Sequence, residues 1–560
     1  MLEAFLNWIV KFFGKSEPPA GKDLPAGGSA NVTATRENTE SGGVDPMERE
    51  RDQVKTQTKD TGKSAPHGSD GRGAPAAIEA VQQQPARSRR LEARPQKKQA
   101  VSVNVGVDFG TSSTKVFLRS LYHGKIYGCL FDDNPDGYPP VCVPSVVRIR
   151  NGRVYFGAEA ERLAGGLALR SFKMCLRCQA RGRVFPQCPN RDHACNKPGQ
   201  LSLNSEADEP ALADEVSAWF LAFVISEIRK RTSQLFADYE PSLTFQMAAP
   251  LGAVESELQR LVFERALYVA EKLSPVVSQG MPLDELRSCY QGIALAIHEL
   301  PSEEERRTFV QPETHAAMIG YAASRVADAG LYAIVDIGAG TTDISFFRLS
   351  RDGDRLAYYS TDTVSLGADI VDQRIFDEHM APAHPELRQY SRTDILGQIR
   401  VAKQRLHGRT VLAGQFELSE KALNASALSV GRGLFKEYQR VWRQAYQKEM
   451  RQSRWQGGYK LFLIGGGSEL GQLVAPISAS PCPQLLPAVE LRSLALPESI
   501  VSEPSGDDDV IQSYTRLLMV AYGLSFHTAE SPDYFTPKEV EPLPPPPTIE
   551  RPSWDIGPFE

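Results

Sequence analysis

Alternating apolar and polar positions mark the first predicted element of the chain. Val103, Val105 and Val107 alternate with polar or small residues, which predicts a short buried β-strand. The strand leads into Asp108 and a turn of glycine and hydroxyl residues, and a second apolar run follows at 116–118. The pattern therefore predicts a β-hairpin whose turn is built from glycine and hydroxyl side chains.

The same pattern recurs in the second half of the chain. A buried strand predicted at 331–335 leads into Asp336, a glycine-hydroxyl turn at 338–343 and a further apolar run. A third glycine turn, 465–467, ends an apolar strand predicted at 461–464 but has no aspartate before it. Two copies of strand, aspartate and glycine turn make a chance match improbable.

These turns have the chemistry of a phosphate site. Glycine lets the backbone approach a ligand, and successive N–H groups in such a turn form a concave site for an anion. A carboxylate at the strand end, Asp108 or Asp336, is placed to meet a magnesium ion carried by that anion. Two facing hairpins could hold a phosphate chain, whereas the third turn suits a base and ribose. One hairpin alone is equally well explained as a tight turn with an incidental aspartate.

The two ends of the chain have a different composition. Residues 1–15 are predicted to form an amphipathic helix, because large apolar side chains recur at helical spacing over residues 2–13. This helix is expected to contact a membrane surface or a partner protein, and docking onto the folded part is the alternative. Residues 16–100 are predicted to be a disordered linker with a basic end, and residues 528–560 a proline-rich tail.

Overall composition narrows the class of protein. With 41% hydrophobic and 24% charged residues, most of the 560-residue chain can fold. The formal net charge of -6 argues against nucleic-acid binding through bulk electrostatics. No apolar run is long enough for a transmembrane helix, and eight cysteines are too few and too unevenly placed for a disulfide framework. The expected location is the cytoplasm, at the inner face of a membrane if the first helix meets lipid.

The order of the motifs DxGT, DxGxGTTD and GGGS resembles that of the actin, sugar kinase and heat-shock ATPase superfamily. Within it, the chain is most similar to the nucleotide-binding domain of 70-kDa heat-shock chaperones of the DnaK type. The resemblance implies an α/β fold, in which duplicated ribonuclease-H-like domains form two lobes of an actin-like ATPase over 101–527. Further stretches that resemble that domain are 143–147, 157–160, 171–173, 248–250, 312–317, 366–372 and 520–524. The lobes would span about 101–310 and 311–510, and a closing helix 511–527.

The resemblance also implies ATP and Mg²⁺ as ligands. Lys173 would stabilise charge on the γ-phosphate, Glu313 would complete the polar network around the attacking water, and the catalytic set would include Asp336 and Thr341. Asp108 and Asp336 would hold Mg²⁺ through its water ligands. The implied nucleotide-binding residues are Asp108, Gly110, Thr111, Ser112, Gly338, Ala339, Gly340, Thr341, Lys403, Gly465, Gly466, Gly467 and Ser468.

Several positions depart from the family pattern. Ala339 replaces the middle glycine of the second turn, which requires a negative φ at this residue. Arg400 stands where the adenosine-facing helix often has glutamate, and Glu469 stands where a basic residue is common. The stretch after His527 is expected to hold no β-sandwich peptide-binding domain, so the standard chaperone cycle is not expected of this chain alone.

Four cysteines are clustered shortly after Lys173. Cys175, Cys178, Cys188 and Cys195 have a spacing that fits a tetrahedral zinc site, and free thiols in a loop are the alternative. Since the cluster begins two residues after Lys173, a metal there could rigidify the segment that carries this lysine.

The sequence leaves four functions open. The first is a chaperone-like ATPase that acts as a nucleotide-driven switch on an unidentified client or partner, tethered by its N-terminal helix. The second is a polymerising bacterial actin-like ATPase. The third is a small-molecule kinase, which would need a catalytic aspartate in place of Lys173. The fourth is a scaffold that binds nucleotide without turnover.

Overall fold

A computed structural model gives the fold of one compact unit, Glu92–Glu560. The residues described are 98–131, 134–135, 138–184, 188, 197–203, 209–254, 256–297, 299–324, 326–350, 352–389, 392–404, 411–413, 416–448, 458–479, 489–503 and 508–536. The amphipathic helix predicted at 1–15 lies outside these residues, as do most of the predicted linker and most of the tail. The helix, and the linker and tail over these residues, therefore stay predictions.

The first large sheet carries the first glycine hairpin. Its seven strands in the described residues include the path β12-β10-β1-β2-β3-β20, with β4 paired to β2. The central strand β1 is longer than the valine pattern predicts. It begins at Gln99, inside the stretch predicted to be a linker. The bounds are β1 (Gln99–Asp108), β2 (Ser113–Ser120), β3 (Ile126–Cys129), β4 (Val143–Pro144), β10 (Tyr239–Ala249), β12 (Thr308–Pro312) and β20 (Ile500–Glu503).

The second large sheet carries the second glycine hairpin and ends at the third glycine turn. Its six strands in the described part of the chain follow the order β19-β18-β13-β14-β15-β21. The bounds are β13 (Gly330–Ile337), β14 (Thr342–Leu349), β15 (Arg355–Val364), β18 (Tyr459–Ile464), β19 (Val489–Arg492) and β21 (Asp533–Phe535).

The two sheets have the same pattern of strand pairing. In each, two parallel pairings lead to the first strand of the glycine hairpin, two antiparallel pairings follow, and a short parallel strand closes the sheet. The first hairpin pairs Asp108 with Lys115, and the second pairs Asp336 with Asp343. The same strand arrangement therefore places an aspartate beside a glycine turn twice.

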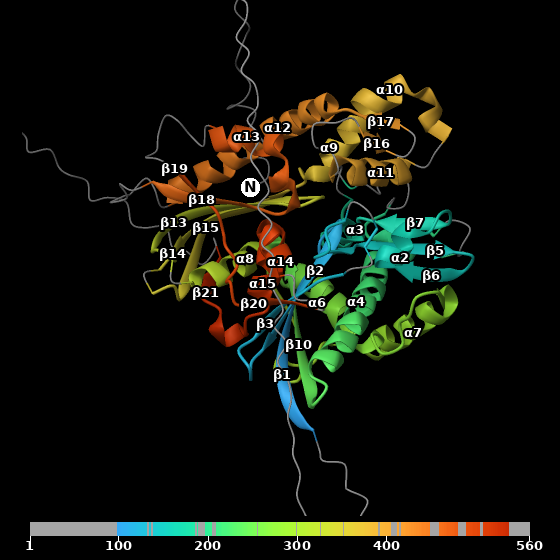
Figure 1. The fold of residues 1–560 in the computed structure, drawn as a ribbon, viewed down its shortest axis with the longest axis vertical. Helices are drawn as coiled ribbons and strands as arrows, with labels where there is room; N and C mark the ends of the chain where they lie inside the picture. The colour runs from blue at the N-terminus through green and yellow to red at the C-terminus, as the bar shows by residue number, and fades with distance from the viewer. Residues whose placement is uncertain are drawn as a thin grey trace, which may run out of the picture. The chain divides into compact units, whose positions relative to one another are not determined.

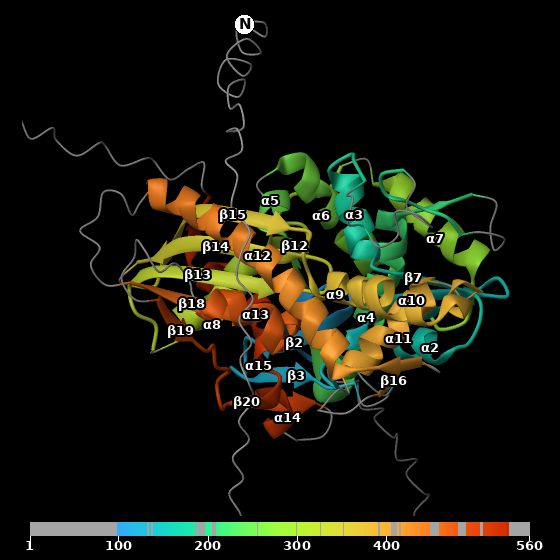
Figure 2. The ribbon, with the colours of Figure 1, turned by 90° about the horizontal axis from the view of Figure 1, so that it is seen from above.

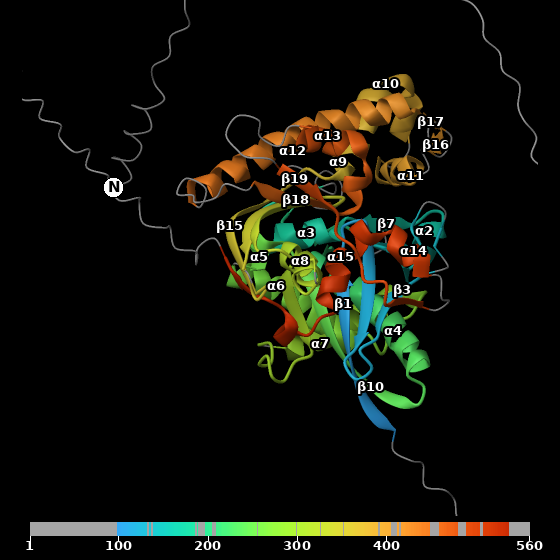
Figure 3. The same cartoon turned by 60° about the vertical axis from the view of Figure 1, so that its left-hand side comes forward.

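Helices cover the sheets in layers. α4 (Ala213–Leu235) and α6 (Glu257–Leu273) contact the first sheet, and α12 (Glu420–Lys448) contacts β14 and β15 of the second (Figure 1). α8 (Glu313–Ala322) and α15 (Thr515–Leu524) contact each other and strands of both sheets. Views from above and from the side show α12 and α13 (Gly471–Ala479) together on the second sheet (Figures 2 and 3).

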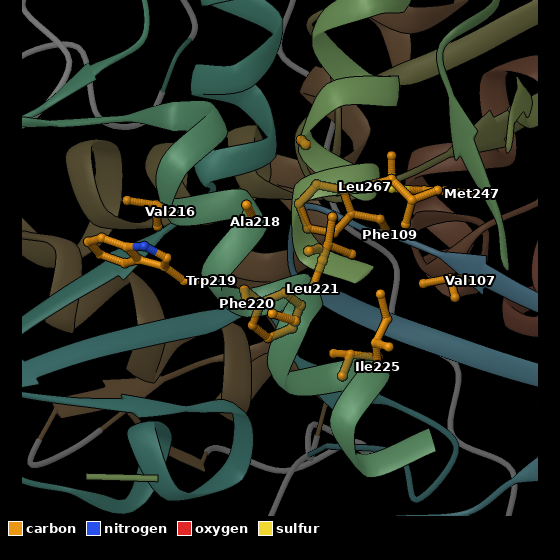
Figure 4. Packing of buried hydrophobic residues seen from close by; sticks show 14 of the residues in the cluster. Val107, Phe109, Val216, Ala218, Trp219, Phe220, Leu221, Ile225, Met247 and Leu267 are labelled. Carbon is orange, nitrogen blue, oxygen red and sulfur yellow. The ribbon is translucent and has the colours of Figure 1, made fainter. Parts of the chain in front are cut away.

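Between these layers, the described residues form three hydrophobic cores. The first lies between the first sheet and α4 and α6, and Figure 4 shows Phe109, Phe220 and Leu267 within it. The second lies under α12, and the third surrounds α8 and α15 between the sheets. Gly523 allows the third core to close, because a Cβ atom there would lie 1.7 Å from the carbonyl oxygen of Ala316.

Smaller elements surround the two sheets. A four-stranded sheet among the described residues has the order β11-β6-β5-β7. Two further sheets in the described residues have two strands each, β8 with β9 and β16 with β17. The remaining bounds are β5 (Val146–Arg150), β6 (Arg153–Phe156), α2 (Gly157–Arg162), β7 (Leu167–Arg170), α3 (Phe172–Ala180), β8 (Gln200–Leu201), β9 (Ala211–Leu212), α5 (Leu251–Val254), β11 (Met281–Pro282), α7 (Leu283–Ala296), α9 (Ala368–Arg374), η2 (Ile375–Met380), α10 (Ala381–Ala383), η3 (Pro385–Gln389), α11 (Arg392–Gln404), β16 (Val411–Ala413), β17 (Phe416–Leu418), η5 (Gly466–Glu469), α14 (Asp508–Ser513) and η6 (Thr528–Glu530).

The start of the predicted proline-rich tail is part of the folded unit. β21 pairs in parallel with β15, and Tyr534 packs against the ring of His315 at 4.6 Å between ring centroids. The pairing with β15 and the ring contact of Tyr534 hold this strand on the second sheet. In the described part of the chain, no helix combines the length and the apolar character that a membrane span requires.

His315 makes stability depend on pH. Burial lowers the pKa of His315 to about 3, and its Nδ1 has no hydrogen-bond partner among the described residues. The unfolded chain protonates this histidine near pH 6.5 and the folded state does not, so the free energy of unfolding falls as pH drops through this window. We expect wild type to lose about 2 kcal/mol more than His315→Gln between pH 6.5 and 5 in urea titrations. Parallel curves for the two proteins would contradict this prediction.

Candidate functional site

A cavity of about 880 Å³ lies where the glycine turns of the two large sheets meet. Residues of all three glycine turns line it, together with α3, α8, α11, α12 and α15. The predicted site residues in its wall are Asp108, Gly110, Thr111, Ser112, Lys173, Glu313, Asp336, Gly338, Ala339, Thr341, Lys403, Gly465, Gly466 and Gly467. The structure therefore brings most of the predicted site residues, from segments that lie far apart in the chain, into one cavity wall.

Two of the predicted nucleotide-binding residues, Gly340 and Ser468, do not line the cavity. Gly340 belongs to the second turn but faces Met174 and Thr111, whose atoms would lie 2.9 and 3.1 Å from a Cβ atom at this position. Ser468 is buried, and its hydroxyl donates to the carbonyl oxygen of Gly465 at 2.7 Å. Both residues shape the turns, and neither lines the cavity.

The second glycine turn tolerates its alanine. Positive φ angles occur among the described non-glycine residues only at Asn151 and Ser171, so Ala339 has the negative φ that its Cβ atom requires. The turn is closed by the N–H of Gly338, which donates to the carbonyl oxygen of Thr341 at 2.9 Å. The departure from the glycine pattern therefore leaves the turn intact.

The third turn packs on the carboxylate of the second hairpin. Gly465 has φ +80, and a Cβ atom there would lie 2.3 Å from Oδ1 of Asp336. A side chain at this position is therefore excluded by backbone conformation and by space. The close approach brings the third glycine turn and Asp336 to the same part of the cavity.

Lys173 and Glu313 meet at the cavity wall from different elements. Nζ of Lys173, on the first turn of α3, donates to Oε1 of Glu313, at the start of α8, at 2.5 Å. Burial opposes the charge on Lys173, but Glu313 and Asp108 outweigh it and raise the pKa of this lysine. Lys173 therefore keeps its positive charge, and its ion pair with Glu313 fixes this charge in the wall that also contains the glycine turns.

Acidic side chains crowd the same wall. Burial, with the charges of Glu313 and Asp108, raises the pKa of Asp336 to about 7. Burial and a hydrogen bond with Glu313 raise the pKa of Asp343 well above its usual range. Four carboxyl groups thus share the region with Lys173 and Lys115, and a bound cation would favour the ionised form of the carboxyl groups whose pKa is raised.

The wall fits magnesium held through water. In the part of the chain that the structure describes, no three histidine, cysteine or acidic side chains converge closely enough to hold a metal directly. Magnesium keeps several water ligands and needs only one or two carboxylates when phosphate oxygens complete its shell. Asp108 and Asp336 would hold such an ion through its waters, and its charge would offset the negative charge of a bound phosphate.

Lys115 is a site residue that sequence reasoning missed. It follows the first turn on β2, and its Nζ lies 3.0 Å from Oδ2 of Asp108 in the cavity wall. Burial opposes its charge, but Asp108 is among the groups that raise the pKa of Lys115. The available signal was a lysine directly before the apolar run 116–118, at the register position opposite Asp108.

The cavity wall includes a second ion cluster. Lys403 lies in the wall as predicted, but its Nζ is already paired with Asp372 at 2.6 Å and contacts the carbonyl oxygen of Ala368. Arg400 pairs with Asp369 at 2.8 Å. Asp369 and Asp372 therefore pair with Arg400 and Lys403, and the adenosine contact of Lys403 stays a prediction.

The cysteine cluster is partly described. Cys175, Cys178 and Cys188 are buried in the first core, and the Sγ atoms of Cys175 and Cys188 lie 3.8 Å apart. Cys195 lies outside the described residues. The described residues hold no group of three converging metal ligands, so the zinc prediction is not confirmed. An Sγ–Sγ distance of this size suits thiolates that share one zinc ion, because each Zn–S bond is about 2.3 Å long.

Metal analysis tests the zinc prediction. We expect about one zinc per chain in purified wild type and much less in the Cys178→Ser, Cys188→Ser double variant. A variant with Cys289→Ser is the control, because Cys289 is a half-buried thiol on α7. Equal and negligible zinc in wild type and the double variant would rule the site out.

Comparisons with known proteins match part of the chain. No model of a known protein family matches it. Over 120 residues it is 32% identical to a chaperone protein HscA homolog of Burkholderia multivorans, a stretch that covers 21% of this chain and 19% of the relative. The corresponding protein of Burkholderia cenocepacia matches with the same identity and coverage. The chain thus spans about a fifth of the length of these curated relatives, and over that stretch it is similar, at the family level, to heat-shock-type chaperones.

Proposed function

We propose that this protein binds Mg²⁺ and ATP in the cavity and hydrolyses ATP as a nucleotide-driven conformational switch. The observation that carries the proposal is the buried Lys173–Glu313 ion pair, which lies in the same wall as both glycine turns. Phosphoryl transfer depends mainly on positioning and electrostatic stabilisation, and this wall supplies a fixed cation, backbone N–H groups and carboxylates.

In this proposal, a bound phosphate chain is held by the two glycine turns and by charged side chains of the wall. The turns at 110–112 and 338–341 bind the phosphate chain from two sides. Lys173 stabilises charge that develops on the terminal phosphate, and Glu313 orients Lys173 and accepts a hydrogen bond from the attacking water. Lys115 gives a second cation, which exchanges its contact with Asp108 for a phosphate oxygen.

We also propose that the unit is a two-lobed, actin-like ATPase of the heat-shock type. The identical pairing pattern of the two sheets supports a duplicated domain. The partial similarity to chaperones supports a chaperone-like role with an unidentified client or partner. Residues 2–13 would tether the ATPase to a membrane or to that partner, which the amphipathic sequence pattern supports.

The test is nucleotide binding and hydrolysis by the purified chain. We expect ADP and ATP to bind in the presence of Mg²⁺, and ATP to be hydrolysed slowly without any acceptor. Binding without turnover would support a scaffold instead. ATP-dependent pelleting would favour an actin-like polymer, and absence of nucleotide binding would overturn the proposal.

A further inference from the structure

Arg177 is a buried cation that the proposed phosphate chemistry does not use. It lies one helical turn after Lys173 on α3 and is 3% exposed. It is absent from the residues that line the cavity. Its Nη2 donates to the backbone carbonyl oxygen of Thr363 on β15 at 3.1 Å. Arg177 therefore ties the helix that carries Lys173, which packs on α4 and α6, to a strand of the second sheet.

The contact of Arg177 continues into the acidic wall. The hydroxyl of Thr363 donates to Oδ1 of Asp343. Asp343 shares a hydrogen bond with Glu313, and Glu313 accepts from Lys173 at 2.5 Å. Since Lys173 and Arg177 lie on the same helix, these contacts form a closed ring through α3, α8, β14 and β15.

We propose that Arg177 is a positioning residue for hydrolysis, which holds Lys173 and the Glu313–Asp343 carboxyl pair in register through Thr363. The inference rests on the proposed function, because Arg177 acts only through groups of the phosphate wall. A ring of this kind fixes distances that an ion pair alone leaves free, and a displacement of about 1 Å at a reacting centre can cost on the order of 10²-fold in rate.

The buried, acidic surroundings of position 177 explain why the residue there is an arginine. Burial penalises the charge of Arg177 and lowers its pKa, and the carboxylate of Asp343 is the largest opposing influence. A guanidinium keeps its charge when buried and presents several donors in a fixed plane. Arg177 can therefore hold a backbone carbonyl and face an acidic pair without becoming neutral.

Two variants test the ring from opposite sides. Arg177→Met keeps the length of the side chain and removes its donors. Thr363→Val keeps the carbonyl that Arg177 contacts and removes the hydroxyl that holds Asp343. We expect each to lower kcat for ATP by roughly 10- to 100-fold, with KM and the Kd for ADP within about threefold of wild type.

The double variant separates positioning from general damage. If Arg177 acts through Thr363, Arg177→Met with Thr363→Val loses little more kcat than either single change. Multiplied losses, or equal loss of kcat and ADP affinity, would overturn the proposal. If Arg177→Met fails to fold, wild-type kcat in Thr363→Val would overturn it as well.

Arg181→Met is the matched control. Arg181 follows one further turn along the chain and donates to Gln259 at 3.1 Å, away from the cavity wall. We expect wild-type kcat from this variant.

A readout without turnover keeps this inference distinct from the proposed function. With ADP and Mg²⁺ bound, amide hydrogen exchange over 172–180 should be faster in Arg177→Met and unchanged in Arg181→Met. Absence of hydrolysis in wild type would remove the proposed function. Unchanged exchange in Arg177→Met would remove the role of Arg177.

Discussion

Replacing Lys173 with alanine is expected to lower kcat for ATP hydrolysis by a factor of roughly 10² to 10³. Nζ of Lys173 is held 2.5 Å from Glu313 in the cavity wall, so its charge is in place before nucleotide arrives. A preorganised charge acts mainly on the charge that develops during transfer, so the loss should fall on kcat. Steady-state hydrolysis and titration with a fluorescent ADP analogue measure the two effects separately.

A surface lysine provides the comparison. Lys272 is exposed on α6, pairs with Glu271 and lies outside the cavity wall, so Lys272→Ala should hydrolyse ATP like wild type. Full activity in Lys173→Ala would show that the role implied by the family resemblance is wrong for this residue. Equal loss of ADP affinity and kcat would assign Lys173 to ground-state binding instead.

The hairpins could be predicted because their signals are local. Alternating valines, an aspartate and a glycine-hydroxyl turn occur within a few residues, and strand periodicity and turn chemistry act over that range. A run of glycines directly after an apolar strand marked the turn at 465–467. The long helices α4 and α12 and their cores complete the fold around these hairpins.

The pairings inside the site could not be predicted in the same way. Lys115 faces Asp108 because of strand register, and Lys173 meets Glu313 although 140 residues separate them in the sequence. Arg400 and Lys403 are neutralised by Asp369 and Asp372 on another helix, so their family-based roles gave no indication of these ion pairs. Such contacts depend on how α3, α8, α9 and α11 pack, which no short stretch of sequence encodes.

The parallel between the two sheets also has a functional consequence. Each sheet supplies one aspartate beside one glycine turn, but the partners of the two aspartates differ. Asp108 is paired with Lys115, whereas Asp336 faces Asp343 across the strands and has Glu313 as a further acidic neighbour. The first hairpin is therefore electrically balanced without ligand, and the second has an excess of negative charge. We infer that cation binding stabilises mainly the second hairpin.

Replacing Asp336 with asparagine should accordingly change activity and stability in opposite directions. We expect kcat for ATP to fall by roughly 10²-fold or more, because a magnesium-side carboxylate is lost. In the absence of nucleotide and Mg²⁺, the free energy of unfolding at pH 8 should rise by roughly 2 to 4 kcal/mol, because a buried charge without a cation is removed. Chemical denaturation of the two proteins measures this difference.

The gain in stability should depend on pH. The folded state keeps a proton on Asp336 up to about pH 7, whereas the unfolded chain releases it near pH 4. The folded state therefore binds more protons over this window, and the contribution of Asp336 to stability falls as pH rises through it. The difference between Asp336→Asn and wild type should be largest above pH 7.5 and should shrink toward zero as pH falls below 4. Asp354→Asn, at an exposed carboxylate beside β15, should change neither activity nor this difference. A pH-independent gain, or a loss of stability at pH 8, would contradict the charge crowding assigned to the second hairpin.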